Sequence, residues 1–229
     1  MKKKTWRKHG FDFLTMFIAV ISAFALNNWN DNRRDRNSAD KILIELSNGM
    51  GKDLKDIEAN MEGHRFGIKA CKYFRKLITG QEINIDSLNL YYISLTRDYI
   101  SVQNTAAYET LKSKGLELIQ NDSLRLKIIS LYEHDYSTLR KLEEEYSAMQ
   151  FHNNYFKEIS KQLAPYLEMD QKGNIAGIKL PVLLNKEEEK ILLLYLLEIR
   201  MNRTYNLDYY KTVKEEIISS KRRIEKELN

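Results

Sequence analysis

The stretch Leu46–Phe74, LSNGMGKDLKDIEANMEGHRFGIKACKYF, decides the fold class of this 229-residue chain. Its apolar positions recur at alternating steps of three and four residues, the spacing of a helix that packs along one face. That face contains Leu46, Met50, Leu54, Ile57, Met61, His64, Ile68, Cys71 and Phe74. The pattern predicts a helix over about 38–79 that ends at Gly80 and that Gly49 and Gly51 weaken locally.

A region of shorter helices follows. Asp86 can cap one that runs to about Arg97. Asn104 or Thr105 can cap a second, which ends at Gly115 because glycine favours the left-handed conformation at a helix C-terminus.

A second long helix is predicted from Asn121 or Asp122 to just before Pro165. Its apolar face contains Leu124, Ile128, Leu131, Leu139, Leu142, Tyr146, Met149, Phe156, Ile159 and Leu163. The carboxylates of Glu143–Glu145 are predicted to form a solvated helix face, whereas those of Glu187–Glu189 mark a helix N-terminus.

The third long helix begins at Asn185, where Glu188 completes a capping box, and continues to about Glu227. Before it, residues 166–185 form a loop, the one place where a short strand is expected. The stretch Ile191–Leu197 is apolar on nearly every side, which predicts a central helix covered by neighbours on several faces.

These helices predict an all-α fold, an elongated antiparallel bundle rather than a compact α/β enzyme. A helix of 40 residues extends about 60 Å. No repeat, linker or shift in composition divides residues 38–229, so we expect a single domain there, in a helical region that spans 30–229.

The N-terminal segment predicts a membrane anchor. Residues 1–10 form a basic leader, and the run Phe11–Leu26 is almost wholly apolar after Asp12. Its sixteen residues would extend about 24 Å as a helix, somewhat less than a bilayer core of about 30 Å. Trp6 and Trp29 flank the run where indoles favour the membrane interface. A transmembrane helix is therefore predicted over residues 11–29, in contact with the lipid bilayer.

Two alternatives to a retained anchor stay open. Ala23-Phe24-Ala25 offers a signal-peptidase site that would cleave the chain after Ala25, although Asp12 interrupts the hydrophobic region. A buried amphipathic helix is less favoured because no polar face follows the run. A stripe of small or polar residues, Thr15, Ala19, Ala23 and Asn27, either permits close packing of two anchors or reflects the usual composition of membrane spans.

The distribution of charge gives the orientation. The whole formal net charge of +5 lies in residues 1–41, and residues 42–229 carry equal numbers of basic and acidic side chains. Because five basic residues precede the run, the N-terminus is predicted to be cytoplasmic in the cell inner membrane, with an extracytoplasmic domain. A neutral domain lacks the basic surface that phosphate contacts require, which argues against a nucleic-acid partner.

Two stretches resemble a family of uncharacterised, N-terminally anchored, single-span helical proteins common in Bacteroidota. One is the apolar run that passes into Asn27-Asn28-Trp29-Asn30. The other is residues 108–121, YETLKSKGLELIQN, followed by Leu124-Arg125; family members usually carry a small residue at the position of Lys114. The resemblance implies an anchor and a helical domain without an assigned activity. Physically, residues 108–121 predict a corner of the fold, and a ligand-contact role is the alternative.

No residue is singled out as catalytic, cofactor-binding or metal-binding, and no cofactor is expected. His9, His64, His134 and His152 lack the helical spacings of zinc and di-iron sites. Cys71 has no cysteine partner, so a small buried residue is the default interpretation. The many tyrosines are interpreted as wide core side chains in preference to a recognition groove.

The leading hypothesis is a membrane-anchored, non-enzymatic helical scaffold or partner-binding protein, in a homo-oligomer or with a membrane protein partner. The alternative is a small-ligand sensor that signals through a separate partner, because the leader is too short for an output domain. An enzyme whose site is assembled only in three dimensions is the third hypothesis.

Overall fold

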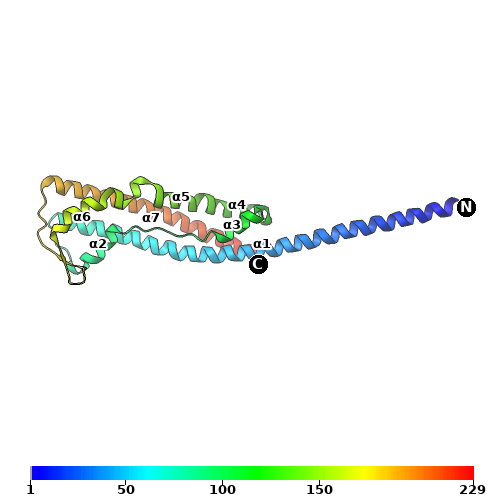
Figure 1. The fold of residues 1–229 in the computed structure, drawn as a ribbon, viewed down its shortest axis with the longest axis horizontal. Helices are drawn as coiled ribbons and strands as arrows, with labels where there is room; N and C mark the ends of the chain where they lie inside the picture. The colour runs from blue at the N-terminus through cyan, green and yellow to red at the C-terminus, as the bar shows by residue number, and fades with distance from the viewer. Residues whose placement is uncertain (1) are drawn as a thin grey trace.

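The computed structural model describes the backbone of residues 2–229 and the side chains of residues 13–229. The described chain is mostly helical and contains one two-stranded hairpin, which confirms the all-α prediction. Figure 1 shows a helical bundle from which a single helix projects far beyond the other elements, with the N-terminus at its tip.

The projecting helix is the first part of α1 (Lys2–Ile78), a continuous helix of 77 residues. At 1.5 Å per residue it extends about 115 Å. It ends as predicted: Gly80 has a φ of +68°, and the Gln81 N–H donates to the Lys76 carbonyl over 2.9 Å. The candidate membrane span and the first bundle helix are therefore parts of one continuous helix.

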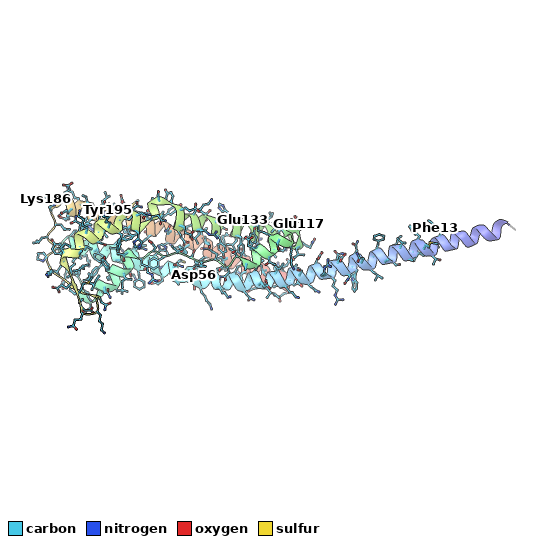
Figure 2. All side chains as sticks on the ribbon, viewed as in Figure 1. Phe13, Asp56, Glu117, Glu133, Lys186 and Tyr195 are labelled. Carbon is cyan, nitrogen blue, oxygen red and sulfur yellow. The ribbon has the colours of Figure 1, made fainter. Side chains whose placement is uncertain are left out.

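The projecting part of α1 contains the one candidate membrane span of the described chain. Its apolar window lies near the N-terminus, and none of that window is buried against protein. Phe13, which Figure 2 labels, stands away from the bundle and is 68% exposed. Length and composition alone make this segment a candidate span, and its orientation stays a prediction from the flanking charges. The Asn27 amide donates to Asp31 within the same helix over 3.2 Å.

Short elements and an extended linker follow α1. They are η1 (Ile85–Ser87), α2 (Leu88–Thr96), α3 (Ala106–Lys114) and η2 (Leu116–Leu118). The cap predicted at Asp86 lies instead at Asn84, whose side chain accepts a hydrogen bond from the Asp86 N–H. Gly115 ends α3 with a φ of +103°, as predicted. Figure 1 shows the linker of residues 97–105 running lengthwise along the bundle between α2 and α3.

The second long helix was predicted to be continuous, and this prediction is wrong. The chain forms α4 (Asp122–Ile129), α5 (Tyr136–Arg140) and α6 (Lys157–Leu163), capped at Asn121 as predicted. Three π-helical segments interrupt them, and each extra residue in a π-turn rotates the apolar stripe relative to the core. The segments are η3 (Ser130–Asp135), η4 (Lys141–Glu145) and η6 (His152–Phe156), with a 3₁₀ turn η5 (Ser147–Met149) in a break between the last two.

Side chains satisfy the carbonyls that this break exposes. The Gln150 amide donates to the Glu143 carbonyl over 2.9 Å, and the Asn154 amide donates to the Ser147 carbonyl over 2.6 Å. Tyr146 was predicted to face the core but lies on the break and is 54% exposed. The rotation and the break together therefore remove the predicted stripe from the core at this point.

A hairpin leads into the last helix. The turn η7 (Ala164–Tyr166) precedes β1 (Leu167–Met169), which pairs antiparallel with β2 (Ile175–Ile178). The helix α7 (Lys186–Leu228) begins with the predicted Asn185 and Glu188 capping box. Its apolar start was expected to be covered on several faces, but Ile191, Leu194 and Leu197 are exposed because only α1 and the α6 side of the bundle cover this end.

The core consists of two apolar clusters along the α1–α7 pair. We call the part of α1 that projects beyond the bundle the stalk. The cluster near the stalk contains α1 residues up to Met61 and α7 residues from Leu207 onward. The distal cluster contains α1 residues from Ala70 onward and α7 residues up to Ile199. In Figure 2, Lys186 and Tyr195 lie at the end of the bundle opposite Glu117. Between the two clusters neither helix contributes a fully buried apolar side chain.

The family-like stretch of residues 108–121 forms a packed corner at the stalk end of the bundle. Leu111 and Ile119 are buried in the cluster near the stalk. Lys114 donates to the Ser38 hydroxyl on α1 over 2.8 Å, and the Asn121 amide donates to Glu227 near the end of α7 over 2.7 Å. These contacts tie the corner to both long helices, as the packing interpretation predicts.

Candidate functional site: a buried polar cavity between the two cores

Two glycines open a notch in α1 where the apolar clusters separate. A Cβ atom at Gly63 would lie 2.2 Å from ring atoms of Tyr99, and one at Gly67 would lie 2.4 Å from the Nε of Arg203. Real Cβ atoms do not approach other atoms so closely. Glycine at both positions therefore lets an aromatic ring and a guanidinium pack directly against the helix backbone.

Arg203 on α7 fills one half of this notch and is 6% exposed. Its Nη2 donates to the carbonyls of Leu95 and Arg97, at 2.9 and 3.0 Å, where α2 ends. These carbonyls form the negative end of a helix dipole and are otherwise free to accept. The guanidinium carbon lies 5.2 Å from the centre of the Tyr99 ring. Arg203 thus holds the end of α2 and the start of the linker against α7.

His64 lies beside it on α1 and is 3% exposed. Its ring packs against Tyr99 and Tyr210, with centroid separations of 5.4 and 5.3 Å. Burial, and to a smaller extent the charge of Arg203, lower the pKa of His64 to about 3. His64 is therefore neutral at physiological pH, with one ring nitrogen able to donate and the other able to accept.

Glu143 lines the opposite side of the cavity. The prediction that Glu143–Glu145 form a solvated face is wrong for Glu143, which is 8% exposed. Its carboxylate accepts the Ser101 N–H at 3.2 Å, the Ser101 hydroxyl at 3.1 Å and the Tyr210 hydroxyl. Burial raises the pKa of Glu143 to about 7, against the opposing effect of these hydrogen bonds. The residue lies four positions after the buried Leu139, a spacing that places it on the core side.

The linker of residues 97–105 depends on this and two other carboxylates. An extended segment outside a sheet must find partners for its backbone N–H groups. Here acids on α1 and η4 supply them: Ser101 donates to Glu143 over 3.2 Å, Val102 to Asp56 over 2.9 Å and Asn104 to Asp53 over 2.9 Å. Asp53 is 1% exposed and also accepts the Tyr136 hydroxyl over 2.8 Å. The linker is therefore fixed by side chains along its length.

A cavity of ≈ 40 Å³ lies among these groups. Five buried nitrogen or oxygen atoms of the described side chains have no hydrogen-bond partner, and four of them belong to His64, Arg203 and Asn206, which line it. A water needs about 10–15 Å³ of such space, so the cavity has room for about three or four atoms of that size. Its lining is His64, Asp98, Tyr99, Ile100, Glu143, Met149, Phe151, Tyr155, Ile199, Asn202, Arg203 and Asn206.

The two buried titratable groups of the site give opposite pH dependences. Glu143 has a raised pKa in the folded state, so its burial costs stability as the pH rises from its unfolded value of 4.5 through about 7. This cost reaches about 3 kcal/mol above pH 7. His64 has a lowered pKa in the folded state, so its burial costs stability as the pH falls from its unfolded value of 6.5 toward about 3. Between pH 4.5 and 6.5 the two effects oppose each other.

An outer groove of ≈ 1050 Å³ adjoins the cavity and shares Met149 and Asn202 with it. We use this name for the surface hollow lined by Ile68, Lys72, Leu142, Tyr146, Ala148, Met149, Arg200, Met201, Asn202, Thr204, Tyr205 and Asp208. A second hollow along α1 continues it through the shared Lys72 and Arg200, and adds Arg75, Lys76 and Leu197. The floor is mainly apolar and the rim is mainly basic.

The remaining residues considered from the sequence lie outside the cavity. Cys71 is 3% exposed, as expected of a small core residue, and burial raises its pKa to about 11. The imidazole of His152 lies 3.5 Å from Asp98 at the surface. The side chain of His9 lies outside the described residues. Within residues 13–229, no three His, Cys, Asp or Glu side chains are grouped as metal ligands.

Sequence reasoning missed Tyr99, Glu143, Arg203 and Asn206. A signal existed for Arg203 and Asn206, because Ile199, Arg203, Asn206 and Tyr210 follow the same helical spacing as the core. No sequence signal pairs Gly63 and Gly67 with Tyr99 and Arg203, because those contacts join segments distant in the chain.

Comparison with models of protein families, with curated proteins and with solved structures gives no match to this chain. The resemblance to the anchored Bacteroidota family stays a prediction. The fold and the site define an all-α protein with one candidate membrane span, a buried polar cavity and an exposed apolar groove.

Proposed function

We propose that the chain is a membrane-anchored, non-enzymatic helical protein that binds a partner at the outer groove. One observation carries this proposal. One face of α7 exposes Leu194, Leu197, Met201 and Tyr205 by 50, 41, 60 and 56%; Met201 and Tyr205 line the outer groove, and Leu197 lines the adjoining hollow. These residues follow helical spacing, so they form one apolar row rather than scattered exposed side chains.

The groove favours an amphipathic helix with acidic flanks. Lys72, Arg75, Lys76 and Arg200 surround the two hollows, and Asp208 is the only acid that lines them. From Leu194 to Tyr205 the row extends about 16 Å, which matches three turns of a partner helix. Carboxylates beside its apolar face would complement the basic rim. A neighbouring membrane protein that carries such a helix in its domain outside the bilayer is the partner class we propose.

A second copy of this chain fits the groove less well. Two copies anchored in one bilayer point the same way, so a symmetric pair has its twofold axis along the stalks. Such an interface brings each residue close to its own counterpart at the centre. Arg200 and Lys72 would then face Arg200 and Lys72 of the other copy, and like charges destabilise such a contact. The predicted homo-oligomer therefore becomes an alternative outcome of the test.

The test uses full-length protein in detergent micelles with defined peptide probes. We expect an 18-residue amphipathic helix of leucine and glutamate to bind, with an affinity that falls as salt increases. A lysine analogue and a scrambled glutamate peptide serve as controls. Met201→Lys should abolish binding, whereas Leu126→Lys, at an exposed apolar position on α4, should preserve it. Equal binding of all peptides would overturn the proposal. So would a disulfide-linked dimer formed in membranes by the variant Met201→Cys.

Small-ligand sensing is a second candidate, and the buried unpartnered polar atoms of the cavity favour it. His64 belongs to the same uninterrupted helix as the candidate span, about 57 Å from Leu26. A change in the packing of α1 at the notch would therefore reach the stalk without crossing a loop. A ligand that raises the melting temperature and also changes the cross-linking between stalks would support sensing. Cross-linking that is the same with and without the ligand would refute it.

A further inference from the structure

The cavity contains a buried cation without a carboxylate partner. None of the ion pairs among the described side chains includes Arg203, although it is 6% exposed. Its guanidinium bonds only neutral carbonyls, those of Leu95 and Arg97. Buried charges in proteins are ordinarily paired, because leaving water is costly for an isolated ion. The lining thus has a positive charge to be balanced.

The two acids near the cavity do not balance this charge. Glu143 directs its oxygens to Ser101 and Tyr210, and its carboxyl is largely protonated below neutral pH. The side chain of Asp98 is 40% exposed and faces the imidazole of His152 at 3.5 Å. Its effect on Arg203 is the smallest of the charge interactions there.

The unpartnered atoms suit an acceptor. The imidazole of His64 can present an N–H, and both of its ring nitrogens lack protein partners. The Nε of Arg203 is likewise unpartnered. The unpartnered atom of Asn206 is its Oδ1, and a flip of the amide, which exchanges Oδ1 and Nδ2, would present the NH₂ to the cavity instead. The ≈ 40 Å³ of space matches an ion of one to four heavy atoms.

We propose that this cavity binds one small monovalent anion, of the size of bromide or nitrate, with Arg203 as its counter-charge and His64 and Asn206 as hydrogen-bond donors. The ion would complete the junction between the two cores and link α1, α2 and α7 at the notch. This inference rests on the cavity alone, and binding of a partner at the outer groove neither requires it nor follows from it.

The experiment measures the melting temperature of the full-length protein in micelles at constant ionic strength, while sodium bromide or sodium nitrate replaces sodium gluconate. Gluconate is too large for the cavity and controls for general salt effects. We expect a saturable increase with either small anion. Arg203→Met should weaken the apparent affinity about ten- to hundredfold, and Arg200→Met, one turn away on the exposed rim, should leave it unchanged.

Arg203→Met removes the bonds to α2 as well, so a second variant protects the test against misfolding. Asn206→Asp is nearly isosteric and supplies an internal counter-charge, so the protein should fold while the bromide effect disappears. Crystals soaked in bromide should show anomalous density in the cavity of the wild type and none in Asn206→Asp. An increase that does not saturate, one that persists in Asn206→Asp, or a cavity filled by water alone would overturn the proposal. Failure of the anion experiment leaves the result of the peptide-binding experiment at the groove unaffected, so the two proposals can fail separately.

Discussion

Substitution of three glycines of α1 by alanine gives the sharpest test of the notch. In a helix without other contacts, Gly→Ala stabilises by about 1 kcal/mol because alanine loses less backbone freedom on folding. Gly51 meets this condition, since a Cβ atom there has no neighbour within 4 Å. We therefore expect Gly51→Ala to raise the melting temperature by about 2–4 °C.

Gly63 and Gly67 should respond in the opposite direction. At Gly63 the nearest ring atom of Tyr99 lies 2.2 Å from the added carbon, and at Gly67 the Nε of Arg203 lies at 2.4 Å. Ordinary contact begins near 3.4 Å, so the neighbour must move by about 1 Å. Overpacking of this kind costs about 1–3 kcal/mol, and displacing Arg203 also weakens its bonds to α2. The intrinsic gain offsets part of this cost.

The net expectation for Gly63→Ala and Gly67→Ala is a loss of up to about 2 kcal/mol, or a melting temperature lower by up to about 8 °C. Near-ultraviolet circular dichroism of the tyrosines is the suitable assay, because both tryptophans, Trp6 and Trp29, precede the bundle. If Gly63→Ala and Gly67→Ala raise the melting temperature as much as Gly51→Ala does, the argument that close packing requires these glycines is refuted.

Three further predictions concern titration, reactivity and the anchor. Glu143→Gln should gain stability relative to wild type as the pH rises from about 4.5 to about 7, by up to about 3 kcal/mol; a pH-independent difference in the free energy of unfolding would contradict the burial argument. Cys71 should react with a maleimide at pH 8 only on unfolding, and rapid labelling of the native protein would contradict its placement in the core. Intact mass of the membrane-extracted protein should include residues 1–25, and a product beginning at Leu26 would establish cleavage instead.

The sequence predicts those features that depend on local spacing. Each of these features depends on residues within a few positions of one another. They are the apolar face from Leu46 to Phe74, the helix end at Gly80 and the caps at Asn121 and Asn185. The break at Tyr146 was missed because a π-turn changes the register without a glycine or proline to mark it.

The exposure of the start of α7 was missed for a different reason. An all-round apolar helix is equally compatible with burial in a core and with an uncovered binding face, and only the placement of neighbouring elements distinguishes them. Leu192 and Leu196 are buried in the core, whereas Leu194 is exposed and Leu197 lines the second hollow. The surplus of apolar residues that suggested a central helix is therefore the feature that now supports a partner-binding face.

The cavity and the groove lie at one level of the bundle, and this gives the junction a role beyond packing. Met149 and Asn202 line both. Asn202 donates to the Ala148 carbonyl over 2.5 Å, so it fixes the broken segment between η4 and η6 to α7. Arg203 in the cavity and Met201 in the groove belong to one turn of α7. We expect this shared turn to couple the two sites, so the change in the free energy of unfolding for the double variant Asn206→Asp, Met201→Lys should depart from the sum of the two single changes; an additive result would refute the coupling.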